Sequence, residues 1–373
     1  MDGKAPVTDL FAPISFAHGP AMKNRLMLSP LTNLQSHADG SLSDDEFHWL
    51  VKRAQGGFGM TMTCAAFVQM QGRGFPGQLG ISDDSQLPGL TRLAAAIRRE
   101  GSLATVQLHH AGVRSPKELN DGLQPVGPSD FAETGARALS HAEVERLIED
   151  FITAAVRAQK AGFDGAEVHG AHGYVVAQFI SEEFNQREDE FGGSLENRSR
   201  LLFRILDGIR ERCGPEFNLG VRLSPERFGQ KLSEILEISE RLCREGRIDY
   251  IDLSLWDAFK EPNEEAYHGS SLLSWFTRLD RRQVRIGAAG KIRGAREALA
   301  CLQAGADFVA IGRSAILHHD FPQLVRGSSE FQPVRTPVTA DYLRSEGLGE
   351  KFVEYMRTWP KFVADDSPRS GDS

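Results

Sequence analysis

The stretch from residue 163 to residue 200 reads FDGAEVHGAHGYVVAQFISEEFNQREDEFGGSLENRSR. It opens with a short apolar run, residues 165–168, which follows a glycine-bounded turn and leads at once into two histidines and a tyrosine. A run of this kind is typical of a buried parallel strand, and the side chains that follow it lie at the strand's carboxyl end. We therefore expect His169, His172 and Tyr174 to lie together at the end of a buried strand.

Two imidazoles and a phenol at one strand end suit chemistry on a polarised carbonyl group. Both imidazoles can donate hydrogen bonds to an oxygen that becomes negative, and the phenol can supply a proton. Two other interpretations stay open, because a His-x-x-His pair can also bind a metal or form a hydrogen-bonded pair in a protein core. No Asp, Glu or Cys stands at ligand spacing, since Glu182 and Glu183 lie well past the pair.

A dense polar run follows the histidines and the tyrosine. We interpret this run as a functional signal because no packing requirement explains it. Its members are Asn185, Arg187, Asp189, Gly192, Gly193, Asn197 and Arg198.

Eight short β-like runs alternate with amphipathic segments along the chain. They are residues 25–29, 58–63, 103–108, 165–168, 218–222, 250–254, 284–288 and 308–311. This alternation predicts parallel strands with crossover helices, and eight such units predict a (β/α)₈ TIM barrel in the α/β class. A doubly wound open sheet is the alternative, but no GxGxxG motif follows any of the strands.

The barrel is expected to span residues 1–330, with helices over residues 43–54, 90–99 and 141–160. Two segments do not fit the repeat. Residues 112–139 are rich in Gly, Pro, Ser and Asp and too long for an ordinary connection, so they predict an active-site loop or lid after the third strand. Residues 331–373 form a C-terminal tail, and after Lys361 the tail is polar and expected to be disordered.

Composition narrows the classes of function. The 373 residues carry a formal net charge of −8, which argues against a nucleic-acid or anionic-membrane partner. The cysteines have no disulfide, zinc or iron–sulfur spacing and are Cys64, Cys213, Cys243 and Cys301. Neither a signal peptide nor an apolar run long enough to span a membrane is present, so we expect a soluble cytoplasmic protein.

Barrel enzymes place their chemistry at the carboxyl ends of the strands, so the residues there form a candidate site. Glycines and cations after the seventh and eighth strands predict a phosphate site, because a bare backbone allows close approach of the anion. The two loops concerned are Gly290-Lys291-Ile292 and Gly312-Arg313-Ser314. The other candidates are Pro30, Leu31, Thr32, Ala65, Gln107, His169, His172, Tyr174, Arg222 and Ala289.

One run of the sequence resembles the signature of the Old Yellow Enzyme family. It begins HGAHGY and continues through QF, Ser181, Asn185, Arg187, Asp189, FGGS and NR. The resemblance covers about residues 9–322. It implies a barrel that binds FMN without a covalent bond and consumes NAD(P)H to reduce activated C=C bonds by a ping-pong route. A metal-dependent barrel hydrolase that uses the His pair, and a flavin-binding redox sensor without catalysis, remain as alternatives.

The resemblance also implies roles for individual residues. The loop that includes Thr32 would lie along the flavin, Arg222 would lie by its N1–C2 edge, and Arg313 would bind its phosphate. The full set of implied cofactor residues is Ser29, Pro30, Leu31, Thr32, Ala65, Gln107, Arg222, Ala289, Gly290, Lys291, Gly312 and Arg313.

The implied reaction assigns the remaining three residues. His169 and His172 would bind the substrate carbonyl, flavin N5 would deliver hydride to the β-carbon, and Tyr174 would protonate the α-carbon. The chain departs from the family pattern at Leu34, Val113 and Phe191, which places substrate preference rather than flavin chemistry in question.

The C-terminal stretch EYMRTWPKF resembles the tail with which one branch of the family reaches into a partner's active site. Its apolar and aromatic side chains need a packing surface, which either the chain's own barrel or a second copy can supply. The resemblance favours a homodimer or dimer of dimers, in which Arg357 binds substrate in the neighbouring subunit.

Overall fold

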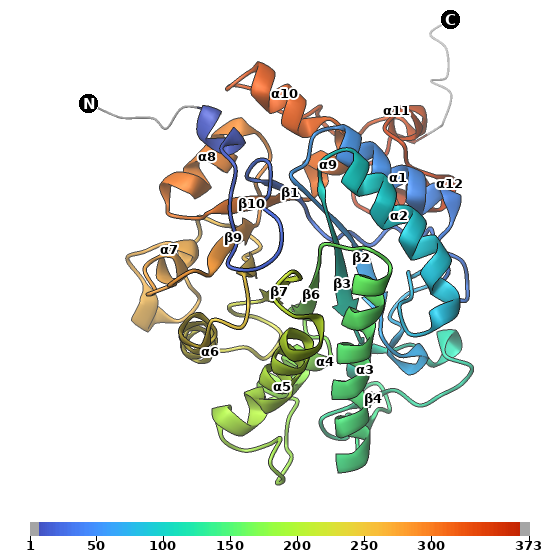
Figure 1. The fold of residues 1–373 in the computed structure, drawn as a ribbon, viewed down its shortest axis with the longest axis vertical. Helices are drawn as coiled ribbons and strands as arrows, with labels where there is room; N and C mark the ends of the chain where they lie inside the picture. The colour runs from blue at the N-terminus through green and yellow to red at the C-terminus, as the bar shows by residue number, and fades with distance from the viewer. Residues whose placement is uncertain (1–6, 366–373) are drawn as a thin grey trace, which may run out of the picture.

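Eight parallel strands close into a barrel in the computed structural model, which describes residues 7–365 (Figure 1). Neighbouring strands follow the order β1-β10-β9-β8-β7-β6-β3-β2, and β1 closes the ring by pairing with both β10 and β2. The (β/α)₈ prediction is confirmed, and each predicted run overlaps one barrel strand. The strands are β1 (Leu26–Leu28), β2 (Met60–Phe67), β3 (Leu103–His109), β6 (Gly165–Gly170), β7 (Asn218–Leu223), β8 (Tyr250–Ser254), β9 (Arg285–Ala289) and β10 (Phe308–Ile311).

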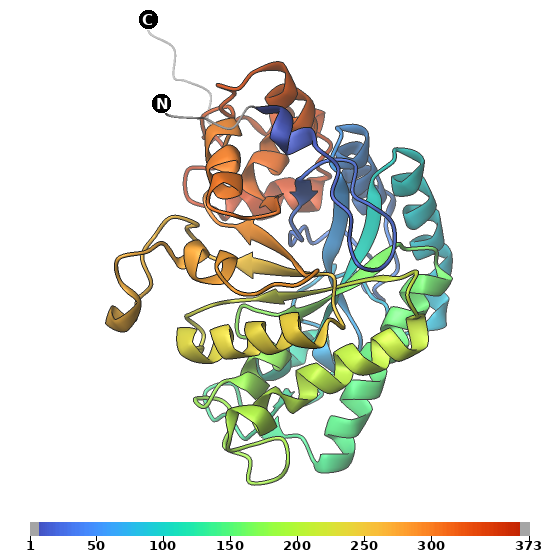
Figure 2. The same ribbon diagram turned by 60° about the vertical axis from the view of Figure 1, so that its left-hand side comes forward.

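Helices cover the outside of the barrel (Figure 2). Their buried apolar faces form one core with the outward-facing side chains of the strands, as a parallel sheet requires. The helices are α1 (Asp44–Gln55), α2 (Leu87–Arg99), α3 (His141–Lys160), α4 (Val175–Ile180), α5 (Leu195–Cys213), α6 (Leu232–Glu245), α7 (Leu272–Thr277), α8 (Ala295–Gln303), α9 (Arg313–Leu317), α10 (Phe321–Gly327), α11 (Ala340–Ser345) and α12 (Glu350–Arg357).

The starts of the helices follow from their sequences. Ser43 caps α1 by accepting a hydrogen bond from the backbone N–H of Glu46. Ser140 and Glu143 form a capping box at the start of α3, in which each side chain accepts from the other residue's backbone. The three helices predicted from the sequence are therefore present, and the one over 141–160 has the predicted bounds.

Large side chains fill the barrel interior away from the carboxyl ends of the strands. Tyr250 and Phe308 are fully buried, with ring centroids 5.6 Å apart. Neighbouring strands make room with glycine, because a Cβ on Gly220 would meet the Tyr250 ring at 2.1 Å and one on Gly287 would meet the Phe308 ring at 2.3 Å. The barrel interior is thus a packed core, and space for a ligand is left at the carboxyl ends of the strands.

The polar run after the histidines braces the connection between α4 and α5. Asn185 Nδ2 donates to the carbonyl oxygens of Phe179 at 2.6 Å and Phe191 at 2.8 Å. The buried Arg198 guanidinium pairs with Glu234 at 2.7 Å and donates to backbone carbonyls. The premise that no packing requirement explains this run is wrong, because Asn185 and Arg198 satisfy buried backbone groups that a short connection cannot pair by itself.

Residues 112–139 form two 3₁₀ turns and a small parallel sheet of β4 (Val126–Gly127) and β5 (Arg137–Ala138). The segment is anchored beside α4, since the N–H of Val113 donates to Gln178 Oε1 at 3.0 Å. It is therefore a folded insertion between β3 and α3, on the side of the barrel.

The C-terminal tail folds back on its own barrel. Phe352, Val353 and Met356 of α12 are fully buried, and the Phe352 ring stands edge-on to Trp49 of α1 at 4.8 Å. The expected disorder after Lys361 is wrong for the residues that follow directly. Phe362 is buried, and the backbone N–H of Ala364 donates to the Val338 carbonyl at 2.8 Å. The rest of that prediction, residues 366–373, lies outside the described residues.

Within residues 7–365, no helix combines the length and the apolar character needed to cross a bilayer. The cysteines are all buried with free thiols: Cys64, Cys213, Cys243 and Cys301.

The packing of the tail makes a stability prediction. Phe352→Ala should lower the free energy of unfolding by about 3–5 kcal/mol, because it removes a fully buried ring from the contact with Trp49. Denaturant unfolding followed by tryptophan fluorescence measures the change. Lys351→Ala, at the exposed neighbouring position, is the control. Equal midpoints for the two variants would show that the tail is not part of the barrel's core.

Candidate active site

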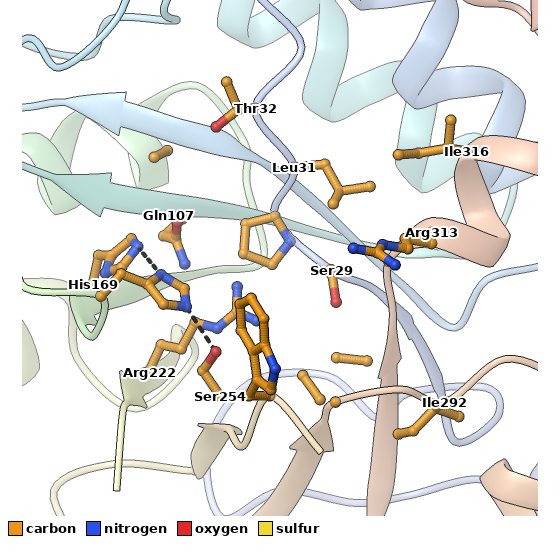
Figure 3. Close-up of a pocket in the computed structure, with 18 of the residues that line it drawn as sticks. Ser29, Leu31, Thr32, Gln107, His169, Arg222, Ser254, Ile292, Arg313 and Ile316 are labelled. Atoms are coloured by element: carbon orange, nitrogen blue, oxygen red, sulfur yellow. Dashed lines mark hydrogen bonds between the residues drawn. The ribbon is translucent and has the colours of Figure 1, made fainter. Parts of the chain in front are cut away.

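A cavity of about 540 Å³ opens at the carboxyl ends of the barrel strands (Figure 3). The sequence candidates converge on it from all over the chain. Those that line it are Ser29, Pro30, Leu31, Thr32, Ala65, Gln107, His169, His172, Tyr174, Arg222, Ala289, Gly290, Lys291, Gly312 and Arg313.

Sequence reasoning missed a second group of lining residues. Ser254 ends β8, so the strand-end rule that found the others would have found it too. Nothing local marks Phe75, which lies in the β2–α2 connection. Tyr355 and Trp359 belong to the tail stretch EYMRTWPKF, whose resemblance pointed to a neighbouring subunit, but they line this chain's own cavity because the tail folds back. The remaining members are Trp256, Arg293, Ala310 and Ile316. Ile292, from the predicted phosphate loop, also lines the cavity.

His169 and His172 form a hydrogen-bonded pair at the end of β6. His169 Nε2 lies 3.3 Å from His172 Nδ1, and His172 Nε2 lies 2.7 Å from Ser254 Oγ. Burial lowers the pKa of His172 to about 3 and holds the pKa of His169 well below its usual range. Both imidazoles are therefore neutral near pH 7, and each carries one N–H that can donate to an oxygen.

The Tyr174 ring packs against these imidazoles, 5.0 Å from the His169 ring and 4.4 Å from the His109 ring. Burial raises the pKa of the Tyr174 phenol, so it keeps its proton at neutral pH. Arg114 lies 4.9 Å above the Tyr174 ring. This arginine comes one residue after Val113, the position where the family pattern has an arginine, so a guanidinium is present on this side of the site after all.

A buried polar layer lies beneath the cavity. Arg222 Nε lies 3.0 Å from the fully buried Asp252 carboxylate, and Gln107 donates to Glu167 Oε1 at 2.7 Å. Burial, and then the charge of Asp252, raise the pKa of Glu167 to about 8. Glu167 is therefore mostly protonated at pH 7, and burial also raises the pKa of Asp252, a shift that the Arg222 charge opposes.

Figure 3 places Arg313 on the side of the cavity away from His169. Lys291 Nζ is already paired with Asp257 at 3.0 Å, so its charge is partly neutralised. Arg293 and Arg313 line the same end, and within the described part of the chain neither pairs with a carboxylate. A Cβ on Gly290 would come within 2.9 Å of the Asp257 backbone nitrogen, so only glycine fits there. This end suits the phosphate of a ligand.

Two predictions find no support in the lining of the cavity. No residue of the segment 112–139 lines it, and the segment approaches the site through Arg114, which contacts the Tyr174 ring and donates to the His172 carbonyl oxygen. Arg357 also does not line its own chain's cavity; its Nε lies 3.0 Å from Glu354. The lid role and the contribution of Arg357 to a neighbouring subunit stay predictions.

The geometry does not favour a metal site at the His pair. In residues 7–365, two clusters bring three possible ligands within 4.8 Å of one another, and neither includes His169 or His172. The clusters are His141 with Glu145 and Glu190, and His319 with Asp320 and Glu346.

Comparison with known proteins gives consistent matches. A family model described as the NADH:flavin oxidoreductase / NADH oxidase family matches residues 9–330. The chain is 38% identical over 339 residues to the probable NADH-dependent flavin oxidoreductase YqiG of Bacillus subtilis (strain 168). The match covers 87% of this chain and 89% of that protein.

Longer relatives and solved structures also match. The NADH:fumarate oxidoreductase of Klebsiella pneumoniae (strain 342) is 32% identical over 338 residues, and the match covers 87% of this chain but 36% of that protein. The chain thus spans about a third of that relative. The structure of the Old Yellow Enzyme homologue from Zymomonas mobilis superimposes with a TM-score of 0.78 at 26% identity, over 93% of this chain and 99% of that one.

The lowered pKa of His172 predicts a pH dependence of stability. The imidazole titrates at about 3 in the folded protein and at about 6.5 in the unfolded chain, so the unfolded state binds the extra proton between these values. Lowering the pH from 7 to 5 should therefore remove about 2 kcal/mol of stability through this one group. Urea unfolding at both pH values measures the loss.

His172→Asn should show a loss on acidification that is about 2 kcal/mol smaller than that of the wild type. Tyr174→Phe is the matched control, because burial moves that phenol's pKa further from this range. If all three proteins lose stability equally between pH 7 and pH 5, His172 is not held neutral in the folded state.

Proposed function

Since the chain belongs to the NADH:flavin oxidoreductase / NADH oxidase family, we propose that it reduces activated C=C bonds, such as those of α,β-unsaturated ketones and aldehydes. The family resemblance of the sequence motif is confirmed, and with it FMN as the cofactor and NAD(P)H as the reductant. The reaction on an alkene is the finer step, and the argument for it rests on the residues of the cavity.

The residues present fit FMN. Pro30, Leu31 and Ala65 offer apolar surface for a flat ring, and Arg222 offers a cation for the ring's electron-rich edge. Arg293 and Arg313, which have no carboxylate partner among the described residues, suit the phosphate. Thr32 and Gln107 add polar groups to the lining. When bound, FMN supplies hydride that it has taken from NAD(P)H.

The observation that carries the proposal is the grouping of two neutral imidazoles with a protonated phenol in this one cavity. Neutral imidazoles can donate hydrogen bonds to a carbonyl oxygen without adding a fixed charge. His169 and His172 hold that oxygen and draw electron density from the conjugated C=C bond, so that its β-carbon accepts hydride. Tyr174 then gives its phenolic proton to the α-carbon.

Two other functions compete with this proposal. A metal-dependent hydrolase would need a third ligand beside His169 and His172, and the described residues offer none at ligand distance. A flavin-binding redox sensor would need no proton donor in the cavity, whereas Tyr174 lines it next to the His pair. Stoichiometric FMN without turnover of any enone would favour the sensor.

NAD(P)H and the alkene are proposed to use the same cavity in turn, which gives ping-pong kinetics. This follows because no GxGxxG motif follows any of the barrel strands. A homodimer or dimer of dimers and a cytoplasmic location stay predictions.

Tyr174→Phe tests the proton donor. The variant should slow re-oxidation of the reduced enzyme by 2-cyclohexen-1-one by about 10²–10⁴-fold, because the general acid is missing. It should leave reduction by NAD(P)H unchanged, since that half-reaction needs no proton from the phenol. Stopped-flow absorbance separates the two half-reactions. An equal slowing of both would contradict the assigned role, and purified protein that cannot be reconstituted with FMN would defeat the proposal as a whole.

The phosphate end makes a separate prediction. Arg313→Ala and Arg293→Ala should each weaken FMN binding by about 10–100-fold, because each removes a charge-assisted hydrogen bond of about 1.5–3 kcal/mol. Lys291→Ala is the matched control and should have a smaller effect, since its ammonium already pairs with Asp257. Fluorescence titration of the apoprotein with FMN gives the dissociation constants. A larger effect at Lys291 than at either arginine would contradict the assignment of the arginines.

A further inference from the structure

A second cavity, of about 560 Å³, lies next to the phosphate end of the first one. The two cavities adjoin, because Arg293, Arg313 and Trp359 line both of them. Figure 3 shows Arg313 on the side of the first cavity away from His169, so the second cavity lies beyond the phosphate end and not beside the imidazoles. Its volume is in the range of sites that bind small ligands.

One wall of the second cavity is the segment 332–336, all of whose residues line it. This segment is fixed to the rest of the barrel. The backbone N–H of Val334 donates to His318 Nε2 at 2.9 Å. Just after the segment, the N–H of Val338 donates to the Phe362 carbonyl oxygen at 3.0 Å. The wall therefore has a defined position before any ligand binds.

Arg335 gives the second cavity a cation of its own. It lines this cavity and not the first one, so it stays available when Arg293 and Arg313 hold the phosphate of FMN. Within residues 7–365, the Arg335 guanidinium has neither an ion pair nor a hydrogen bond. An unpaired guanidinium on a cavity wall can donate two parallel hydrogen bonds to the oxygens of a phosphate group.

The remaining surface of the second cavity is largely apolar. Val334 lines it and is 38% exposed, and Leu317, Pro333 and Phe362 add further apolar side chains. The Trp359 ring lies on the border with the first cavity. A free guanidinium beside exposed apolar surface suits a ligand in which a phosphate is joined to a flat ring system.

NAD(P)H has this combination of groups. Its nicotinamide has to reach the flavin in the first cavity to transfer hydride, so its pyrophosphate and adenosine have to lie outside that cavity. No GxGxxG motif follows any of the barrel strands, and the sequence therefore shows no dinucleotide-binding fold to receive them. The second cavity adjoins the first and offers the charge and the apolar surface that this half of the molecule needs.

We propose that the second cavity binds the adenosine diphosphate half of NAD(P)H, with Arg335 donating hydrogen bonds to a phosphate of that half while the nicotinamide lies in the first cavity. The inference rests on NAD(P)H as the reductant and not on the alkene as the acceptor. An enone has no such half and uses the first cavity alone.

Arg335→Ala tests the contact in the FMN-loaded enzyme. The dissociation constants of NADH and NADPH, taken from the concentration dependence of flavin reduction, should rise about 10–100-fold, as expected for one lost charge-assisted hydrogen bond. The limiting rate of reduction should not change, because Arg335 does not line the first cavity. Reduction by 1-benzyl-1,4-dihydronicotinamide, a hydride donor without phosphate, should also stay the same. Arg99→Ala, which removes an equal charge from the last turn of α2, is the control.

Calorimetry with ADP gives a second measurement that needs no turnover. ADP should bind the oxidised FMN-loaded protein, and Arg335→Ala should weaken this binding about as much as it weakens NADH binding. ADP should also compete with NADH in flavin reduction. It should leave the dissociation constant of 2-cyclohexen-1-one unchanged, since the enone occupies the first cavity.

Equal dissociation constants of NADH for the wild type and Arg335→Ala would overturn the proposal. So would competition between ADP and the enone, or an equal loss with the donor that has no phosphate. Equal effects on NADH and NADPH assign Arg335 to the pyrophosphate, whereas an effect on NADPH alone assigns it to the 2′-phosphate. A protein with the expected nucleotide binding that reduces no enone would contradict the proposed function and leave this site standing.

Discussion

The packing of Tyr250 and Phe308 inside the closed barrel is the constraint on which the rest of the structure depends. Each ring occupies space that a neighbouring strand leaves open by having glycine, and a Cβ on Gly220 or Gly287 would lie well inside contact distance. The interior is therefore filled away from the carboxyl ends of the strands. Because all eight strands run in the same direction, their carboxyl ends form one ring above these packed side chains, and the cavity lies there.

Burial of the side chains around the cavity decides their charge states. The imidazoles of His169 and His172 are shielded from water, so they stay neutral, and the Tyr174 phenol keeps its proton for the same reason. Beneath them Asp252 lies 3.0 Å from Arg222 Nε, while Glu167 remains mostly protonated at pH 7. The result is a site with hydrogen-bond donors and a proton source on one side and Arg293 and Arg313 on the other, an arrangement that suits a polar substrate group and the phosphate of an anionic cofactor in one cavity.

The tail adds to the site from far along the chain. Phe352 and Met356 are buried in the core, and this anchoring brings Tyr355 and Trp359 to the cavity wall. The Arg313 guanidinium lies 5.1 Å from the Trp359 ring, so the tail also contacts the phosphate end. The same helix therefore stabilises the barrel and lines the cavity, so a change that displaces this helix would alter both the stability of the fold and the shape of the site.

The sequence by itself determined the barrel, the strand ends and the residues His169, His172, Tyr174, Arg222 and Arg313, because hydrophobic periodicity and a local motif are encoded within short windows. It did not determine that the polar run from Asn185 to Arg198 is a structural brace, nor that Ser254 touches His172. It also did not determine that Phe362 is buried or that the tail lines the cavity. Those facts depend on pairs of residues that lie far apart in the chain, such as Ser254 and His172, or Arg198 and Glu234. Only the closed barrel brings such residues together, since hydrogen bonds and burial depend on distance in space rather than on position in the sequence.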